Sequence, residues 1–271
     1  MRIIVTGGNS GVGKATASTL AENGHSVVIA CRSIENASQA AAEMPGDVGV
    51  AQLDLADLAS VHAFADSVET VDVLVNNAGV MGLPLTRTAD GFEAHMGTNH
   101  LGHFALTCLL GDKITDRVVS VASAMYHFAR IHFDDLNWHT RQYSAMAAYG
   151  ESKLANLLFV RELAARGVRA YASDPGMTDT GMSRRLATGL PVGERHPVWR
   201  ILHTPDQGAR ASLQAVITDL PSGTYLAPRF NQWGRPSVTG LRKKARDPVA
   251  ARRLWALSAE LTGCDWPSPR R

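Results

Sequence analysis

Short apolar runs alternate with segments of helical periodicity along most of the chain. The runs predict strands at residues 1–5, 25–30, 49–55, 71–75, 117–121 and 168–172. Between them, apolar residues recur every three or four positions, which predicts helices at residues 14–23, 58–68, 91–110 and 147–165. A last helix is expected at about 247–263, with Asp247 as its cap and Pro248 as its first residue. This alternation predicts one doubly wound α/β domain over residues 1–271, with a parallel sheet of about seven strands and helices on both faces.

Length and composition agree with such a domain and exclude several other classes. The 271 residues contain 45% hydrophobic and 19% charged residues, as globular domains do. A net charge of +2 is too small to indicate a nucleic-acid partner. We see no signal peptide, transit peptide or membrane span, and therefore expect a cytoplasmic protein without stable membrane insertion.

Cysteine and histidine spacing indicates neither a disulfide framework nor a metal site. Cys31, Cys108 and Cys264 are far apart and form no C-x-x-C motif, which suits a reducing compartment. His100 and His103 are three residues apart on a predicted helix, but no cysteine or acidic partner lies at ligand spacing. We therefore expect no metal.

A glycine-rich turn follows the first predicted strand and precedes the first predicted helix. Backbone N–H groups of such a turn, together with the helix dipole, form an anion site that suits a pyrophosphate. The alternative is an ordinary strand-to-helix turn, because the spacing G-x-x-x-G-x-G differs from the usual dinucleotide fingerprint. The strand before the turn and the helix after it favour a cofactor site, with contacts from Gly7, Asn9, Ser10, Gly11, Val12 and Gly13.

The end of the second predicted strand bears on which cofactor would bind. An acidic residue near this point holds the ribose 2′-OH of NAD, whereas an arginine accommodates the 2′-phosphate of NADP. Here the acid is absent and Arg32 follows Cys31. We expect a preference for NADP(H) over NAD(H); the alternative is that Arg32 is only a solvated surface residue.

Tyr149 and Lys153 are four residues apart on a predicted helix and so share one face. A phenol has a pKa of about 10, and an acid–base group works best with a pKa near the working pH. We expect the Lys153 ammonium and an oxidised nicotinamide to lower the pKa of Tyr149 by about 2–3 units. Ser123, at the end of the fifth strand, would donate a hydrogen bond to the substrate oxygen. The alternative is a surface Tyr/Lys pair without function.

These motifs, in this order, resemble the short-chain dehydrogenase/reductase family over nearly the whole chain. Further matching segments are Asp54-Leu55, residues 76–79, Asn99, and Pro175-Gly176 followed by Thr180. Residues 98–104 and 152–156 are similar to the retinol dehydrogenase branch and its WW-domain oxidoreductase and protochlorophyllide reductase relatives.

The resemblance implies an oxidoreductase that moves a hydride between a nicotinamide and a carbonyl or alcohol. It implies a catalytic set of Asn99, Ser123, Tyr149 and Lys153, with Asn99 in a proton relay through water and Lys153 also on the nicotinamide ribose. The cofactor contacts implied beyond the glycine turn are Asp54, Leu55, Asn76, Ala78, Gly79, Tyr149, Lys153, Pro175, Gly176, Thr178 and Thr180. It also implies a homodimer or homotetramer that pairs through the two long helices at 91–110 and 147–165.

The substrate is expected to be a lipophilic or aromatic small molecule. A lid at about 177–203 and a second wall at 124–138 carry many apolar and aromatic residues, although these could equally be core. The other functional readings are a catalytically silent NADP-binding regulatory protein and a scaffold; the presence of both Tyr149 and Lys153 favours the enzyme. Basic residues between 242 and 253 are expected to be a solvated face, with contact to an anionic membrane surface as the alternative.

Overall fold

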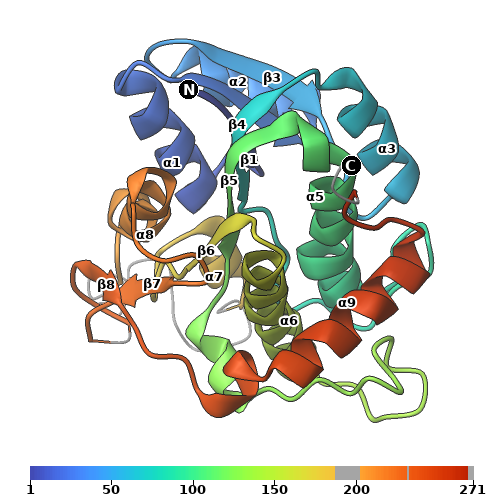
Figure 1. Cartoon of the computed structure of the whole chain (residues 1–271). Helices are drawn as coiled ribbons and strands as arrows, with labels where there is room; N and C mark the ends of the chain where they lie inside the picture. Colours follow the sequence, from blue (N-terminus) through green and yellow to red (C-terminus); the bar gives the residue numbers. More distant parts are fainter. Residues whose placement is uncertain (187–201, 231, 268–271) are drawn as a thin grey trace.

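The structure is a computed structural model that describes residues 1–186, 202–230 and 232–267. One eight-stranded sheet, in the order β3-β2-β1-β4-β5-β6-β7-β8, runs through the centre of the molecule (Figure 1). Its strands are β1 (Arg2–Thr6), β2 (Ser26–Cys31), β3 (Val48–Gln52), β4 (Val71–Asn76), β5 (Ile114–Val121), β6 (Arg169–Ser173), β7 (Tyr225–Pro228) and β8 (Pro236–Val238). All neighbours pair in parallel except β8, which returns antiparallel to β7. The predicted doubly wound α/β fold is confirmed.

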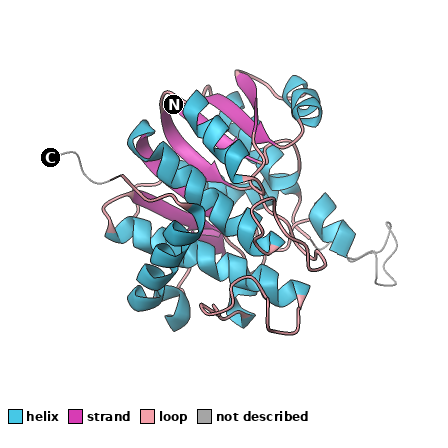
Figure 2. Cartoon of the chain, turned by 90° about the vertical axis from the view of Figure 1, so that its right-hand side faces the viewer, coloured by secondary structure: helices cyan, strands magenta, loops and turns pink. Residues whose placement is uncertain are grey.

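Helices cover both faces of the sheet (Figure 2). Alternate strand residues face opposite sides: Ile3 and Val5 pack with α1 (Gly11–Glu22), α2 (Ile34–Ala42) and α8 (Pro205–Ile217). Ile4 and Leu74 pack on the other side with α3 (Leu58–Ser67), α5 (Gly102–Leu110) and α6 (Ala145–Ala165). The short helices among the described residues are α4 (Ala94–Met96), α7 (Gly181–Leu186) and the 3₁₀ segments Gly111–Lys113, Ala124–Phe128 and Lys243–Arg246. In the described part of the chain, no helix is long and apolar enough to cross a membrane.

The predicted helix at 91–110 is interrupted. It begins only at Ala94, because the Glu93 carboxylate accepts the N–H groups of His95 and Met96 at its start. A π-helical turn, Gly97–Leu101, then separates α4 from α5. Single π turns widen a helix locally and are common at functional sites. This one contains Asn99, a predicted site residue.

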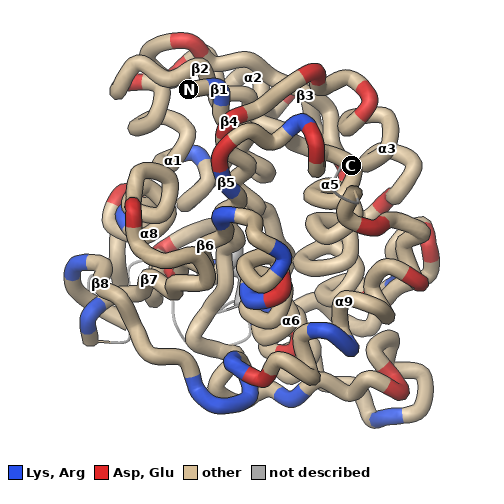
Figure 3. Tube along the Cα trace, viewed as in Figure 1, with Lys and Arg blue, Asp and Glu red and all other residues tan. Residues whose placement is uncertain are grey.

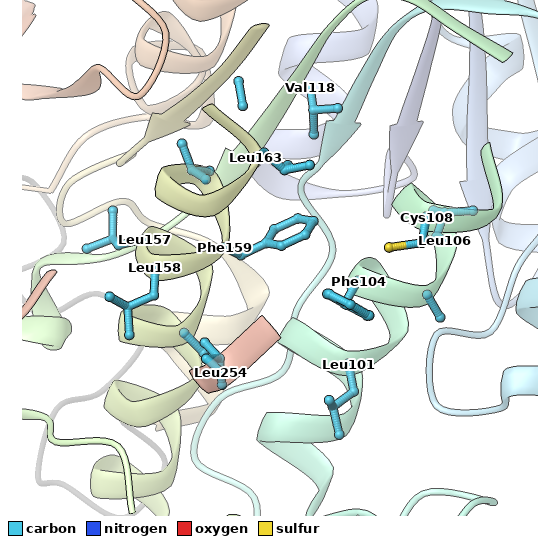
Figure 4. Close-up of a cluster of buried hydrophobic side chains, with 14 of the residues drawn as sticks. Leu101, Phe104, Leu106, Cys108, Val118, Leu157, Leu158, Phe159, Leu163 and Leu254 are labelled. Atoms are coloured by element: carbon cyan, nitrogen blue, oxygen red, sulfur yellow. The ribbon is translucent and has the colours of Figure 1, made fainter. Parts of the chain in front are cut away.

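The C-terminal helix α9 (Pro248–Thr262) lies across α5 and α6, and Figure 4 shows Leu254 beside their apolar side chains. Asp247 caps its first turn, and Gly263 ends it at φ 67°. The Trp255 ring lies 4.9 Å from that of Phe104 and stacks 5.7 Å from that of Phe159, centroid to centroid. α9 therefore covers faces of the two helices on which we expected a subunit interface. Pairing through those faces would need α9 to move away, and the oligomeric state stays a prediction.

Lys and Arg positions gather in the segment before α9 (Figure 3), and most of these side chains are exposed. Arg242, Lys243 and Arg246 are exposed, whereas Lys244 donates to the carbonyl oxygens of His127 (2.9 Å) and Ala129 (2.6 Å). Lys244 therefore holds the loop after β5, whereas Arg242, Lys243 and Arg246 face solvent, as expected.

Candidate active site

The glycine turn lies at the carboxyl end of β1 and leads into α1. Gly7 and Gly11 have φ values of 65° and 54°, a region that favours glycine. A Cβ on Gly13 would lie 2.4 Å from the Gly7 carbonyl oxygen, so the helix packs on the turn at a distance that only glycine allows. Ser10 is the N-cap of α1 but makes no side-chain capping bond. The first N–H groups of α1 thus stay available to an anion, and the turn fits the pyrophosphate of a dinucleotide.

The segment after β6 closes over this turn. A Cβ on Gly11 would lie 3.2 Å from the Thr180 methyl carbon, so Thr180 lies directly across from the turn. Thr178 is buried, and its hydroxyl donates to the carbonyl oxygen of Pro175 at 3.0 Å. The structure thus brings Thr180 next to the glycine turn, and the roles of residues 175–180 in binding a cofactor stay a prediction.

The two ends of the expected lid are joined in the described residues. The N–H of His203 donates to the Met177 carbonyl oxygen (2.8 Å), and the N–H of Asp179 donates to the His203 carbonyl oxygen (2.9 Å). The middle of that lid, residues 187–201, lies outside the described residues.

A hydrogen-bonded cluster fixes the chain after β4. The Thr6 hydroxyl accepts the N–H groups of Asn77 and Ala78, both at 2.9 Å. It also contacts His103 Nε2 at 2.8 Å, and His103 Nδ1 lies 3.0 Å from the Asn99 carbonyl oxygen. His103 therefore links the cofactor turn to the π-helical turn, a role that the sequence alone did not indicate.

The other predicted cofactor contacts fall into two groups. Arg32 is exposed directly after β2, and Asp54 is half-buried after β3 with its carboxylate accepting the Ala56 N–H at 2.9 Å. Leu55 and Asn76, in contrast, have buried side chains, and Asn76 donates to the Thr107 hydroxyl at 2.9 Å. A cofactor would meet only the backbone of these last two residues.

Tyr149 and Lys153 share the face of α6 that looks toward the end of β5. Tyr149 is hydrogen-bonded to Ser123, which follows β5. Lys153 Nζ lies 5.6 Å from the centre of the Tyr149 ring and donates to the Val121 carbonyl oxygen at 3.1 Å. The predicted phenol, hydroxyl and ammonium are therefore brought together at one point, where Tyr149 and Lys153 are buried and Ser123 is half-buried.

The pKa of Tyr149 differs from our expectation. Burial raises the pKa of Tyr149 to about 12, although the hydrogen bond from Ser123 acts to lower it. Burial also lowers the pKa of Lys153 to about 8. Desolvation of the phenol outweighs any help from Lys153, so the protein's own groups do not provide the predicted lowering of the Tyr149 pKa.

Asn99 is buried in the π-helical turn beside these residues. Its side-chain amide donates to the Val80 carbonyl oxygen (3.0 Å) and the Ser152 hydroxyl (2.9 Å), and its oxygen accepts the Val80 N–H (2.7 Å). A Cβ on Gly79 would lie 3.1 Å from Asn99 Oδ1 and 3.6 Å from Lys153 Nζ. Both side chains therefore lie next to Gly79, where a larger residue would crowd them.

Sequence reasoning missed Asp174, which directly follows β6 and is 2% exposed. Its carboxylate accepts the N–H of Gly176 at 2.8 Å and the hydroxyl of Tyr225 at 2.7 Å. It also interacts electrostatically with Tyr149 and Lys153. An acidic residue before Pro-Gly was visible in the sequence, but its burial was not.

The expected substrate wall at 124–138 is partly core. Tyr126, Ile131 and Trp138 are buried, while Phe128 is exposed. Arg141 links this segment to α6, because it donates to the Asp135 carbonyl oxygen at 2.8 Å and to the Glu151 carboxylate at 3.0 and 3.2 Å. The alternative interpretation, that these residues are core, therefore applies to Tyr126, Ile131 and Trp138 but not to Phe128.

His100 and His103 act as buried neutral residues. His100 Nε2 lies 2.9 Å from the Ser258 hydroxyl on α9. Burial lowers the pKa of His100 to about 3 and that of His103 to about 4. Within the described residues, no group of His, Cys, Asp and Glu could hold a metal ion.

Comparisons with known proteins show the family to which this chain is similar. Residues 1–134 match the family model described as short chain dehydrogenase. The chain is 40% identical to human retinol dehydrogenase 13, over 99% of this chain and 86% of the relative, and 40% identical to mouse retinol dehydrogenase 12, over 97% and 87%.

Solved structures give the same result. A putative uncharacterized protein from Mycobacterium paratuberculosis superposes with a TM-score of 0.86 at 43% identity, over 98% of this chain and 95% of the other. A short chain dehydrogenase from Burkholderia cenocepacia, in complex with NADP, superposes with a TM-score of 0.65 at 26% identity, over 83% and 95%. The chain belongs to the short-chain dehydrogenase family, in its retinol dehydrogenase-like branch, and is an oxidoreductase that acts on CH–OH and C=O groups.

Proposed function

We propose that this oxidoreductase uses NADP(H) to interconvert the alcohol and carbonyl forms of a lipophilic small molecule, with a retinoid as the first candidate. The observation that carries the proposal is that Tyr149, Ser123 and Lys153 lie together beyond the end of β5. Support for the substrate class comes from the retinol dehydrogenases to which the chain is similar. Support for NADP comes from Arg32, exposed after β2, and from the relative in complex with NADP.

The cofactor supplies the hydride in reduction, and its oxidised ring is positive when bound. In reduction, the Tyr149 hydroxyl gives its proton to the substrate oxygen as that oxygen gains negative charge. Ser123 donates a hydrogen bond to the same oxygen and holds it beside the phenol. In oxidation, Tyr149 takes the proton back. A pKa near 12 keeps the phenol protonated across neutral pH, which suits the proton donor of a reductase.

Lys153 and Asn99 support this proton transfer. The Lys153 ammonium stabilises the phenolate left after the proton has gone, and Asn99 lies beside it across Gly79. We propose that Asn99 and Lys153 form the start of a proton relay to solvent. The adenosine end of the cofactor would meet Arg32 and Asp54, and its pyrophosphate would meet residues 7–13 and Thr180.

The test is a panel of aldehydes, ketones and alcohols that includes all-trans-retinaldehyde, assayed with NADPH and with NADH. We expect turnover of lipophilic aldehydes with NADPH and its loss in Tyr149→Phe. The alternative, a silent NADP-binding regulator, predicts NADPH binding without turnover of any panel member. That outcome would overturn the proposed activity but not the family membership.

A further inference from the structure

Glu93 and His95 form a buried pair beside the active site that has no part in the reaction described above. Both side chains are 0% exposed, and His95 Nδ1 lies 2.7 Å from the Glu93 carboxylate. Burial acts to raise the pKa of Glu93, but hydrogen bonds from His95 and Met96 outweigh it and hold that pKa below its usual range. A buried carboxylate is costly unless it has several partners, so its partners indicate what the pair does.

The two ring nitrogens of His95 have different partners. A carboxylate can only accept, so Nδ1 carries the ring proton and donates it to Glu93. Nε2 accepts the N–H of Leu83 at 3.3 Å, and Leu83 lies in the loop that follows Gly79 after β4. The ring is thus bonded at both ends, once to the start of α4 and once to that loop, and it cannot turn without losing a hydrogen bond.

Tyr143 joins this network from the segment before α6. Its hydroxyl lies 2.9 Å from the same Glu93 oxygen and 3.2 Å from the Leu83 carbonyl oxygen. Glu93 also accepts the backbone N–H groups of His95 and Met96, at 3.0 and 2.8 Å. One carboxylate therefore connects three segments: the loop after β4, the start of α4 and the residue before the N-cap of α6.

The ring of His95 meets the ring of Tyr149 edge to face. The two centroids are 6.3 Å apart and the ring planes cross at 69°. Aromatic pairs favour such an arrangement at separations of about 4.5–7 Å. Tyr149 is buried, its hydroxyl is hydrogen-bonded to Ser123, and Lys153 Nζ lies 5.6 Å from its ring centre. His95 therefore contacts the ring from α4, whereas Lys153 and Ser123 approach it from α6 and from the end of β5.

We propose that His95 is a positioning residue of the active site, whose ring, oriented by Glu93 and Leu83, holds the ring of Tyr149 in the orientation in which its hydroxyl meets Ser123. Without the His95 ring, the phenol gains room to tilt. Its hydroxyl then leaves the position beside the substrate oxygen in part of the molecules, and proton transfer slows because the reacting atoms are less often in line. The proposal rests on the proposed role of Tyr149.

The first experiment compares single-turnover reduction, NADPH binding and thermal stability in variants of the full chain, with NADPH and the best substrate of the panel as probes. His95→Asn keeps a donor for Glu93 and His95→Gln keeps an acceptor for Leu83, but both lack the ring. We expect each to lower the rate per folded molecule by about 3- to 10-fold, the factor that corresponds to loss of an edge-to-face contact. NADPH binding should not change, because the glycine turn belongs to another part of the site, after β1.

Two further variants separate the ring contact from the hydrogen bonds. His95→Phe keeps a ring against Tyr149 and should recover most of the rate, although it removes the acceptor of the Leu83 N–H and should lower the melting temperature. Tyr143→Phe removes a partner of Glu93 but leaves the His95 ring in place, so it should lower stability without lowering the rate per folded molecule. A purely structural role predicts instead that the rate follows stability across all four variants.

A crystal structure of His95→Asn with NADPH, or of His95→Gln if the first variant does not fold, tests the inference without any substrate. We expect the Tyr149 ring to be tilted and its hydroxyl to have left Ser123 in part or all of the molecules. An unmoved Tyr149, parental rates in both ring-free variants, or rates that follow stability would each overturn the proposal. So would failure of both ring-free variants to fold, since His95 would then serve the fold. The crystal structure needs no turnover, so failure of the proposed reaction and failure of this inference are separate results.

Discussion

Lys153 Nζ lies 5.6 Å from the centre of the Tyr149 ring, while both residues are buried in the face of α6 below the end of β5. The ammonium therefore lies under the phenol rather than in water, and its effect on the phenolate is little screened. The same burial raises the pKa of Tyr149 and lowers the pKa of Lys153. These two shifts set the pH range in which the phenol is protonated and the lysine is charged.

Reduction should slow above pH 8. Burial lowers the pKa of Lys153 to about 8, whereas the phenol of Tyr149, with a pKa of about 12, keeps its proton. The ammonium form is therefore present below pH 8 and is lost above it, with about one tenth left at pH 9. Initial rates with NADPH from pH 6 to 9.5 measure this. Lys153→Arg stays charged throughout and serves as the control. If the rate of that variant falls at the same pH, another group causes the decrease.

Arg32→Ala should weaken NADPH binding by about 10- to 100-fold, because a charge-assisted hydrogen bond contributes about 1.5–3 kcal/mol. Arg32 is exposed after β2 with no acidic residue beside it in the sequence. NADH lacks the 2′-phosphate and is the internal control, so its affinity should hardly change. Fluorescence titration with both cofactors gives the two dissociation constants. Equal losses for both would refute a role for Arg32 in the preference.

Gly13→Ala should destabilise the fold by about 1–3 kcal/mol and abolish cofactor binding. The new Cβ would meet the Gly7 carbonyl oxygen at 2.4 Å and Asn77 Nδ2 at 2.3 Å, so α1 must move away from the turn. Gly240→Ala, whose Cβ would meet nothing within 4 Å, is the matched control. Urea unfolding compares the two. A Gly13→Ala protein of parental stability would contradict the close packing.

The protein should lose stability as the pH falls below 6.5. His100 and His103 have folded-state pKa values of about 3 and about 4, so they stay neutral in the fold while the unfolded chain gains protons. The contribution of each histidine to the free energy of unfolding is complete above pH 6.5 and decreases by about 1.4 kcal/mol per pH unit below it. Urea midpoints at pH 7.5 and 5.0 test this, with His100→Gln removing one contribution of about 2 kcal/mol. A pH dependence unchanged in that variant would rule out this role for His100.

Much of the fold and of the candidate site could be predicted, because strands and turns leave local patterns. Apolar runs located six of the strands, and the glycines of residues 7–13 located the turn at the end of β1. β7 and β8 were not located, since four and three residues carry too little periodicity. The π-helical turn around Asn99 was not foreseen either, because helical spacing at 91–110 does not reveal a local change of hydrogen-bond pattern.

What could not be predicted depends on burial and on contacts distant in sequence. The pKa of Tyr149 was expected to fall, but desolvation raises it, and no sequence pattern reports desolvation. Asp174 and His103 gain their roles from partners on other strands and helices. The covering of α5 and α6 by α9 also required the tertiary structure. The cytoplasmic location, the oligomeric state and the substrate stay predictions; light scattering over a range of concentrations measures the oligomer.

The central claim is that Tyr149 is the proton donor in reduction, and Tyr149→Phe tests it most directly. The variant keeps the ring and loses only the hydroxyl that is hydrogen-bonded to Ser123. Single-turnover reduction should be measured with NADPH and the best substrate of the panel, alongside NADPH binding. We predict binding within about twofold of the parent and a rate lower by about 10²–10⁴, the usual contribution of a general acid. A near-parental rate would contradict the account and place the acid elsewhere in the site.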